Sequence, residues 1–168
     1  MKKGLFALLH VLLFLLQINV QAEEPVTVPR TAEAALERAQ VYAHAVNHDF
    51  KTPEKIYAFL CSDFRDQMSE DEFVEAFNKE RSYPYITPLY IFFPEISEET
   101  ETGEYIVTFL QAARIEGMKY DIRMVYEDGN WFVVDWEQFP DGSYLKKFEN
   151  IPYSLDWYYD FGEVKQGG

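Results

Sequence analysis

Four polar side chains near the C-terminal end of the sequence are of types that carry acid–base chemistry: Gln111, Tyr120, Asp135 and Glu137. They occupy three strand-like segments separated by Glu116-Gly117 and Asp128-Gly129, which are typical two-residue hairpin turns. Pairing across these turns places all four side chains on one face of a sheet. A carboxyl group in apolar surroundings holds its proton more tightly and could then act as a general acid or base.

These four residues define a candidate ligand pocket at one end of that face. The pairing sets Phe109 opposite Met124 across the first turn and Trp131 opposite Tyr126 across the second. Polar groups on a mostly apolar, helix-covered face must be hydrogen-bonded, paired or hydrated. Convergent polar groups in a concave site are typical of ligand pockets. The alternative is that this end of the sheet reaches solvent. The sequence assigns no catalytic residue.

Other reactive side chains have simpler explanations. His44 and His48 are four residues apart, as metal ligands on a helix can be, but both point away from the apolar stripe of that helix. We therefore predict no metal site. Cys61 is the only cysteine, so no intrachain disulfide can form, and it is interpreted as a small buried apolar residue. No nucleotide or redox motif is present, and no cofactor is predicted.

Three consecutive helices are expected ahead of the strands. Thr31 is the predicted N-cap of the first, which reaches about His48. Its apolar stripe recurs at steps of three and four residues: Ala32, Leu36, Ala39, Ala43, Val46 and Phe50. Thr52 and Pro53 predict the start of a short second helix. The sequence Ser69–Glu72 is a capping box and predicts a third helix to about Arg81.

The period then changes to that of strands. Tyr85–Phe93 is a predicted edge strand, and the acidic stretch Glu95–Glu104 a predicted loop. Three further strands follow: Tyr105–Ile115, Met118–Glu127 and Asn130–Glu137. The face expected to form the core carries Val107, Phe109, Ile122, Met124, Tyr126, Trp131 and Val133. This order predicts an α+β fold, with three N-terminal helices packed on a curved antiparallel sheet.

The N-terminal 22 residues are typical of a signal peptide. Lys2 and Lys3 precede an apolar run that is shorter than the roughly 20 residues of a membrane-spanning helix. Cleavage is predicted after Ala22, followed by an extended leader over residues 23–30. No cysteine follows the cut, so lipidation is not expected, and the mature protein is predicted to be secreted or periplasmic without stable membrane insertion.

The charge of the chain restricts its partners. The formal net charge is −14, and loss of the two lysines with the signal peptide changes it to −16. Binding to nucleic acid requires clustered basic residues and is not expected. Residues 141–168 are rich in aromatic side chains, which either pack on the domain or form a surface for a glycan or protein partner. The candidates for such a surface are Tyr153, Trp157, Tyr158 and Tyr159.

Two segments resemble the NTF2-like superfamily, whose members have a cone-shaped, cystatin-like α+β fold. One is Ile56–Phe77, and the other is Asp128–Trp136 with its Trp-x-Val-x-Asp-Trp pattern. The second is similar to the end of the non-catalytic NTF2-like domain that precedes some penicillin-binding transpeptidases. The resemblance covers residues 31–140.

The resemblance implies an exported, non-catalytic module that binds an unknown small molecule, envelope protein or glycan at the bacterial cell envelope. The alternative is a small cofactor-free enzyme of the isomerase/cyclase type, with Asp135 or Glu137 as its base. A homodimer closed through the outer face of the sheet is compatible with either function.

Overall fold

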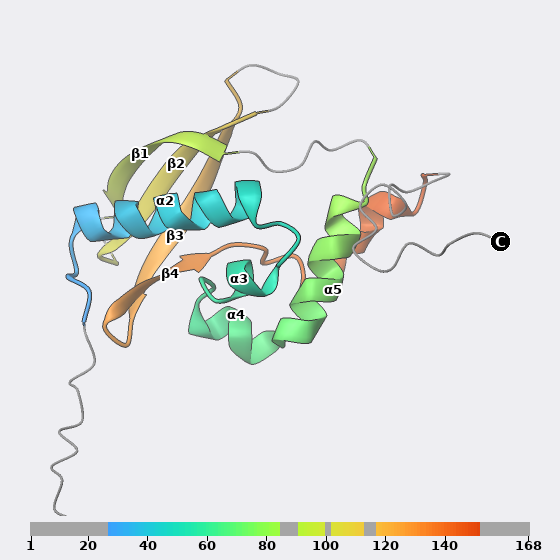
Figure 1. Cartoon of the computed structure of the whole chain (residues 1–168), viewed down its shortest axis with the longest axis horizontal. Helices are drawn as coiled ribbons and strands as arrows, with labels where there is room; N and C mark the ends of the chain where they lie inside the picture. The colour runs from blue at the N-terminus through green and yellow to red at the C-terminus, as the bar shows by residue number, and fades with distance from the viewer. Residues whose placement is uncertain (1–26, 85–90, 100–101, 113–116, 152–168) are drawn as a thin grey trace, which may run out of the picture.

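The fold is α+β, as expected from the sequence. The structure, a computed structural model, describes residues 27–84, 91–99, 102–112 and 117–151 (Figure 1). Its helices are α2 (Ala32–His48), α3 (Glu54–Tyr57), α4 (Ser62–Gln67), α5 (Glu70–Arg81) and the 3-10 helix η1 (Ser143–Phe148). Its strands are β1 (Ile91–Glu99), β2 (Glu104–Gln111), β3 (Lys119–Glu127) and β4 (Asn130–Val134). They form one antiparallel sheet in the order β1-β2-β3-β4.

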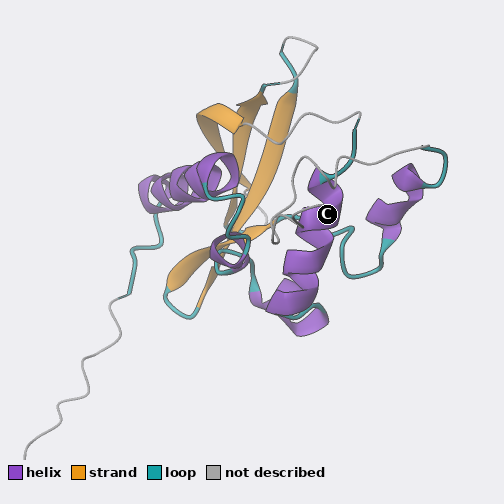
Figure 2. Ribbon diagram, turned by 45° about the vertical axis from the view of Figure 1, so that its right-hand side comes forward, coloured by secondary structure: helices purple, strands orange, loops and turns teal. Residues whose placement is uncertain are grey.

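Helix α2 lies across one face of the sheet, and α5 and η1 lie beyond the end of β4 (Figures 1 and 2). The side of α2 that packs on the strands is lined by small residues, among them Ala35, Ala39 and Ala43. Because these side chains are short, the helix backbone can approach the sheet closely. Within the described residues, no helix combines the length and apolar character needed to cross a bilayer.

Two predicted helix starts are confirmed. The Thr31 side chain accepts a hydrogen bond from the Ala34 amide at 3.3 Å. At α5, the Glu72 amide donates to the Ser69 hydroxyl while the Glu72 carboxylate accepts from the Ser69 amide at 2.8 Å, which completes the capping box. The Ser69 hydroxyl also donates to the Glu72 carboxylate at 2.6 Å, and this bond together with that from the Ser69 amide lowers the pKa of Glu72. Both helices therefore begin where their local sequence specifies.

The region between these helices differs from the prediction. Thr52 does not cap α3, because its hydroxyl donates to the Asp49 carbonyl instead. After α3 the chain becomes extended, and Leu60 forms an isolated parallel bridge with Val133. The Cys61 amide donates to the Val133 carbonyl at 3.0 Å, and a separate helix, α4, follows. The described residues thus contain four helices ahead of the sheet where three were predicted.

These contacts also close one edge of the sheet. The outer side of β4 is paired with Phe59–Cys61, so its backbone groups do not face solvent there. At the opposite edge, the side chain of the buried Asn47 makes two hydrogen bonds to the backbone of Ile91. Its Nδ2 donates to the Ile91 carbonyl at 2.9 Å, and its Oδ1 accepts from the Ile91 backbone N–H at 3.0 Å. The side chain of Asn47 therefore substitutes for a neighbouring strand at the first residue of β1.

The prediction of an acidic loop over Glu95–Glu104 is partly wrong, because residues 95–99 belong to β1. Phe92 pairs with Leu110, and pairing resumes with Glu95 opposite Thr108 after a one-residue bulge. Phe93 occupies this bulge with a φ of 54°, next to Pro94, which has no amide to donate. The bulge lets an acidic segment continue the strand after a proline. Residues 85–90 of the predicted edge strand lie outside the described residues.

The register between β2 and β3 also differs from the prediction. Phe109 pairs with Tyr120 rather than with Met124, and β2 ends at Gln111 while β3 begins at Lys119. Glu116 of the predicted turn lies outside the described residues. The displacement is an even number of residues, so every side chain keeps its predicted face. The Asp128-Gly129 turn is confirmed, with Glu127 opposite Asn130 and Trp131 opposite Tyr126.

The predicted core face is therefore confirmed. Its fully buried members are Val107, Phe109, Ile122, Met124, Trp131 and Val133, while Tyr126 is half-buried. The described part of the leader packs against the same end of the sheet, where the Val28 amide donates to the Gly129 carbonyl at 2.7 Å. Gly129 has a φ of 82°, and a Cβ there would lie 2.8 Å from Thr27 Cγ2, so both the turn and the leader require glycine.

Candidate functional site

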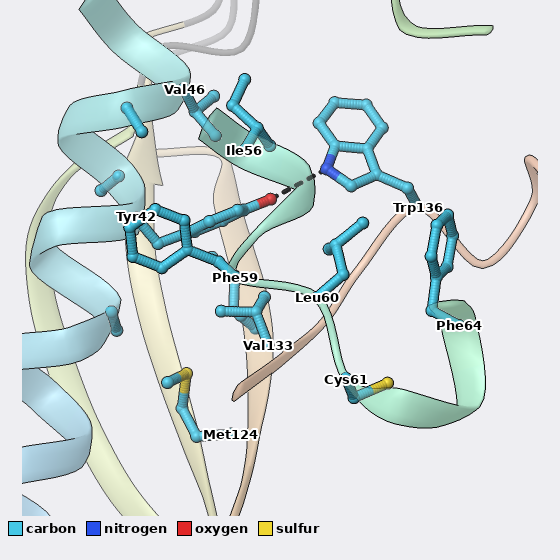
Figure 3. Close-up of a cluster of buried hydrophobic side chains, with 14 of the residues drawn as sticks. Tyr42, Val46, Ile56, Phe59, Leu60, Cys61, Phe64, Met124, Val133 and Trp136 are labelled. Atoms are coloured by element: carbon cyan, nitrogen blue, oxygen red, sulfur yellow. Dashed lines mark hydrogen bonds between the residues drawn. The ribbon is translucent and has the colours of Figure 1, made fainter. Parts of the chain in front are cut away.

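Two of the predicted pocket residues, Tyr120 and Asp135, are brought together in a partly buried cluster. The Tyr120 hydroxyl donates to Asp135 Oδ1 at 2.5 Å, and the Tyr42 hydroxyl donates to Asp135 Oδ2 at 2.5 Å. The Trp136 amide also donates to Oδ1, at 2.7 Å, and the Trp136 indole N–H donates to the Tyr42 hydroxyl at 2.9 Å (Figure 3). We call Tyr42, Tyr120, Asp135 and Trp136 the Asp135 cluster.

The cluster depends on a sharp change of direction after β4. Trp136 has a φ of 60°, in the left-handed region that non-glycine residues seldom adopt. The strand ends at Val134, so Asp135 and Glu137 do not continue the ladder to face Ile122 and Tyr120 as predicted. The turn nevertheless carries the Asp135 carboxylate to the Tyr120 hydroxyl. It also buries the Trp136 ring, whose centroid lies 5.2 Å from that of Phe77.

Burial is the largest influence on the pKa values of the ionisable groups in the Asp135 cluster. It raises the pKa of Asp135, although the hydrogen bonds from Tyr120, Tyr42 and the Trp136 amide act in the opposite direction. Burial and the neighbouring carboxylate raise the pKa values of Tyr42 and Tyr120 well above the usual range, so both phenols stay protonated as donors. The two oxygens of Asp135 thus receive three donors.

The other two predicted pocket residues do not join this cluster. Glu137 is exposed, and Gln111 is half-buried at the end of β2, where its backbone N–H donates to the Met118 carbonyl at 2.8 Å. The predicted convergence of four polar groups is thus reduced to one pair, Tyr120 and Asp135, joined by Tyr42 from α2.

A cleft opens on the face of the sheet opposite α2. It has a volume of about 350 Å³ and lies between α4 and the outward side chains of β3 and β4. We call it the outer cleft, and its lining residues are Cys61, Asp63, Phe64, Gln67, Glu104, Arg123, Val125, Glu127, Val134, Asp135, Glu137 and Pro140. Asp135 therefore lies between its own cluster and this cleft, and Glu137 faces the cleft instead of the predicted pocket.

Charged groups dominate the wall of the outer cleft. The Ser62 amide, at the start of α4, donates to Glu127 Oε2 at 2.9 Å and fixes that carboxylate. Glu104 Oε2 is buried and has no hydrogen-bond partner among the described residues. Arg123 Nε lies 3.8 Å from this oxygen, within ion-pair range but beyond a hydrogen bond.

Cys61 contributes little reactivity to this cleft. The residue is 4% exposed, and burial raises the pKa of its thiol. A buried thiol with a raised pKa is a poor nucleophile at neutral pH. The interpretation of Cys61 as a small buried residue is therefore confirmed.

The remaining candidates from the sequence are placed as follows. His44 and His48 are exposed on α2, as expected, with ring centroids 4.6 Å apart. No three His, Cys, Asp or Glu side chains of the described residues are grouped closely enough to hold a metal ion. The four aromatic residues of the predicted partner surface, Tyr153, Trp157, Tyr158 and Tyr159, lie outside the described residues, as does the predicted signal peptide.

Sequence reasoning missed Tyr42 and Trp136, although a signal for Tyr42 existed. Tyr42 continues the buried series of Ala35 and Ala39 at helical spacing and is followed by Val46 on the same side. The predicted stripe began instead at Ala32 and Leu36, which are only half-buried.

Compared with protein-family models and with curated proteins, the chain matches none.

Proposed function

We propose that this chain is an exported, non-catalytic NTF2-like module that binds a ligand or partner at the bacterial cell envelope. The NTF2-like assignment, with its cone-shaped arrangement, is supported by the α+β order and by the Trp-x-Val-x-Asp-Trp pattern that ends in the Asp135 cluster. Export is supported by the signal-like N-terminal segment.

The occupied carboxylate of Asp135 carries the non-catalytic assignment. A general base must lie within hydrogen-bond reach of the proton that it removes. Both oxygens of Asp135 are already acceptors for Tyr42, Tyr120 and the Trp136 amide. A substrate that approached this carboxylate from the outer cleft would have to compete with these three donors. The cluster is therefore suited to hold α2, β3 and the end of β4 together.

One observation favours the enzymatic alternative. Burial raises the pKa of Asp135, and acid–base catalysts often show such a shift. The Asp135→Asn variant separates the two functions. A structural acceptor predicts a loss of about 1–3 kcal/mol in the free energy of unfolding, because the amide group presents a donor to one of the two phenols. A catalytic base predicts unchanged stability and loss of turnover.

Turnover is measured as deuterium exchange at the carbon next to the carbonyl of cyclohexanone, followed by proton NMR, because isomerases and cyclases of this type begin with that proton transfer. Exchange catalysed by the wild type and abolished in a stable Asp135→Asn variant would reject the non-catalytic function. The matched control is Asp121→Asn, which changes an exposed carboxylate on β3.

Native mass spectrometry of the protein purified from its own organism tests binding and export together. The proposal predicts a chain that begins at Glu23 and carries a stoichiometric small molecule or protein partner. A chain of full length in the cytoplasmic fraction would reject export, and a doubled mass would identify the homodimer.

A further inference from the structure

Three apolar side chains form an exposed patch on the outer face of the sheet, at the end where β1 begins. Phe92 is 41% exposed, Phe93 is 78% exposed and Leu110 is 41% exposed. Phe92 and Leu110 are cross-strand partners, and the ring centroids of Phe92 and Phe93 lie 6.4 Å apart. Phe92 and Leu110 alternate with the buried residues Ile91 and Phe109, so they point away from α2. We call Phe92, Phe93 and Leu110 the Phe93 patch.

Phe93 occupies a position that is unfavourable without a covering partner. Its φ of 54° lies in the left-handed region, which non-glycine residues seldom adopt. The bulge in β1 thus holds an aromatic ring in water at a strained backbone position. Single exposed apolar residues are common on protein surfaces, whereas adjoining ones mark contact surfaces. The Phe93 patch therefore indicates an apolar partner that covers it.

The C-terminal segment of the chain has the sequence pattern of such a partner. From residue 153, apolar side chains occur at every second position: Tyr153, Leu155, Trp157, Tyr159 and Phe161. The residues between them include Asp156 and Asp160. This alternation gives an extended segment one apolar face and one polar face. The apolar face can then lie on a surface while the polar face stays in water.

The described chain ends close enough for this segment to reach the patch. The Ile151 amide donates to the Phe148 carbonyl at 3.3 Å, and the ring centroids of Phe148 and Tyr83 lie 5.1 Å apart. Phe92 follows Tyr83 in the chain after a stretch that spans at most about 32 Å. Residues 152–168 can extend to about 60 Å, which exceeds the whole of this path.

Charge at the rim of the patch favours the same partner. Lys119 is the cross-strand partner of Leu110 and is exposed on the same face of the sheet. Its long side chain can bring the ammonium group to the edge of a segment that lies on the patch. Asp156 and Asp160 supply carboxylates at that edge. An apolar contact flanked by opposite charges fits the C-terminal segment.

We propose that residues 153–161 pack their apolar face on the Phe93 patch of the same chain. Tyr153, Trp157 and Tyr159 then contact the domain and are not available as a surface for a glycan or protein partner. The patch is in turn closed to other proteins while the segment is bound. This inference does not depend on the ligand-binding function proposed above.

The test is hydrogen–deuterium exchange of the purified protein, followed by mass spectrometry of peptic fragments. The reference is a synthetic peptide of residues 152–168. We expect the amides of residues 153–161 to exchange at least about tenfold more slowly in the protein than in the peptide. Phe93→Ser should return their exchange to within about twofold of the peptide, because loss of a buried aromatic ring weakens an apolar contact by roughly tenfold or more.

Val41→Ser is the matched control, because Val41 is 49% exposed on α2, the helix that covers the opposite face of the sheet. It should leave the exchange of residues 153–161 unchanged. Leu110→Ser, in the patch, and Trp157→Ser, in the segment, should act like Phe93→Ser. The amides of α2 should stay protected in every variant, which separates release of the segment from unfolding of the domain.

Three results would contradict the proposal. Exchange of residues 153–161 as fast in the wild type as in the peptide would show that the segment does not pack on the domain. Protection that persists in both Phe93→Ser and Leu110→Ser would show that it packs elsewhere. Protection that increases with protein concentration would assign the patch to the segment of a second copy.

Discussion

The hydroxyl of Tyr42 is the best single point at which to test the energetics of the Asp135 cluster. The residue is fully buried, and its hydroxyl both donates to Asp135 Oδ2 and accepts from the Trp136 indole N–H. Tyr42→Phe removes only this oxygen. It leaves two buried groups without a partner, and each unsatisfied buried group costs about 1–3 kcal/mol. We therefore expect a loss of about 2–5 kcal/mol in the free energy of unfolding.

Tyr120→Phe provides an internal comparison. It removes one donor from Asp135 Oδ1, which still accepts from the Trp136 amide, and Tyr120 is half-buried. The expected loss is about 1–2 kcal/mol, clearly below that of Tyr42→Phe. Tyr57→Phe is the matched control, because the Tyr57 hydroxyl makes one hydrogen bond to the Met68 carbonyl at the half-buried surface, and its loss should cost about 1 kcal/mol.

The assay is urea unfolding followed by far-ultraviolet circular dichroism, which reports on the whole fold. The slope of the free energy against urea should stay constant, so that midpoint shifts report stability. A loss in Tyr120→Phe equal to or greater than that in Tyr42→Phe would refute the reasoning. So would losses below about 0.5 kcal/mol in both variants, since the cluster would then not satisfy buried groups.

Three further predictions follow from other buried groups. Asn47→Leu should lower the free energy of unfolding by about 2–4 kcal/mol, because it removes both hydrogen bonds to Ile91 at the sheet edge; urea unfolding measures this. Cys61 should react with a disulfide reagent at about pH 8 on the order of 100-fold more slowly in the folded protein than in urea, as followed by absorbance. Because folding raises the pKa of Asp135, the stability difference between wild type and Asp135→Asn should be largest below about pH 4 and should shrink as pH rises through the folded-state pKa; urea unfolding at several pH values checks this sign.

Each of these predictions has a clear contrary result. Gln40→Leu changes an exposed side-chain amide on the same helix as Asn47 and should leave the free energy of unfolding within about 0.5 kcal/mol of the wild type. An equal effect of both substitutions would mean that the hydrogen bonds of Asn47 make no particular contribution to stability. Rapid labelling of Cys61 in the folded protein would show a thiol that is accessible after all. A stability difference for Asp135→Asn that grows as pH rises would mean that folding lowers the pKa of Asp135.

Local signals in the sequence determined much of the fold. Thr31 and the Ser69–Glu72 capping box specify helix starts with side chains that bond amides a few residues away, so no distant contact is needed. The Asp128-Gly129 turn follows from the positive φ values that such residues tolerate. The core face follows from the two-residue period of a strand, which survives a register error of an even number of residues.

Tertiary structure decided the positions that depend on distant partners. Pairing of β2 with β3 sets Phe109 opposite Tyr120, and no local turn signal specifies it. Leu60 follows a helix but forms a β-bridge with Val133, because this bridge supplies backbone hydrogen bonds to the otherwise open edge of the sheet.

The candidate site was likewise only half predictable. The sequence predicted Tyr120 and Asp135 on one face of neighbouring strands, and the turn after β4 joins them although Asp135 lies beyond the end of the strand. The third member, Tyr42, comes from a helix 93 residues from Asp135 in the chain. The outer cleft requires α4, which the sequence did not reveal, to lie beside the outward side chains of β3. The sequence alone therefore determined which residues face the core, and only packing decided which of them meet.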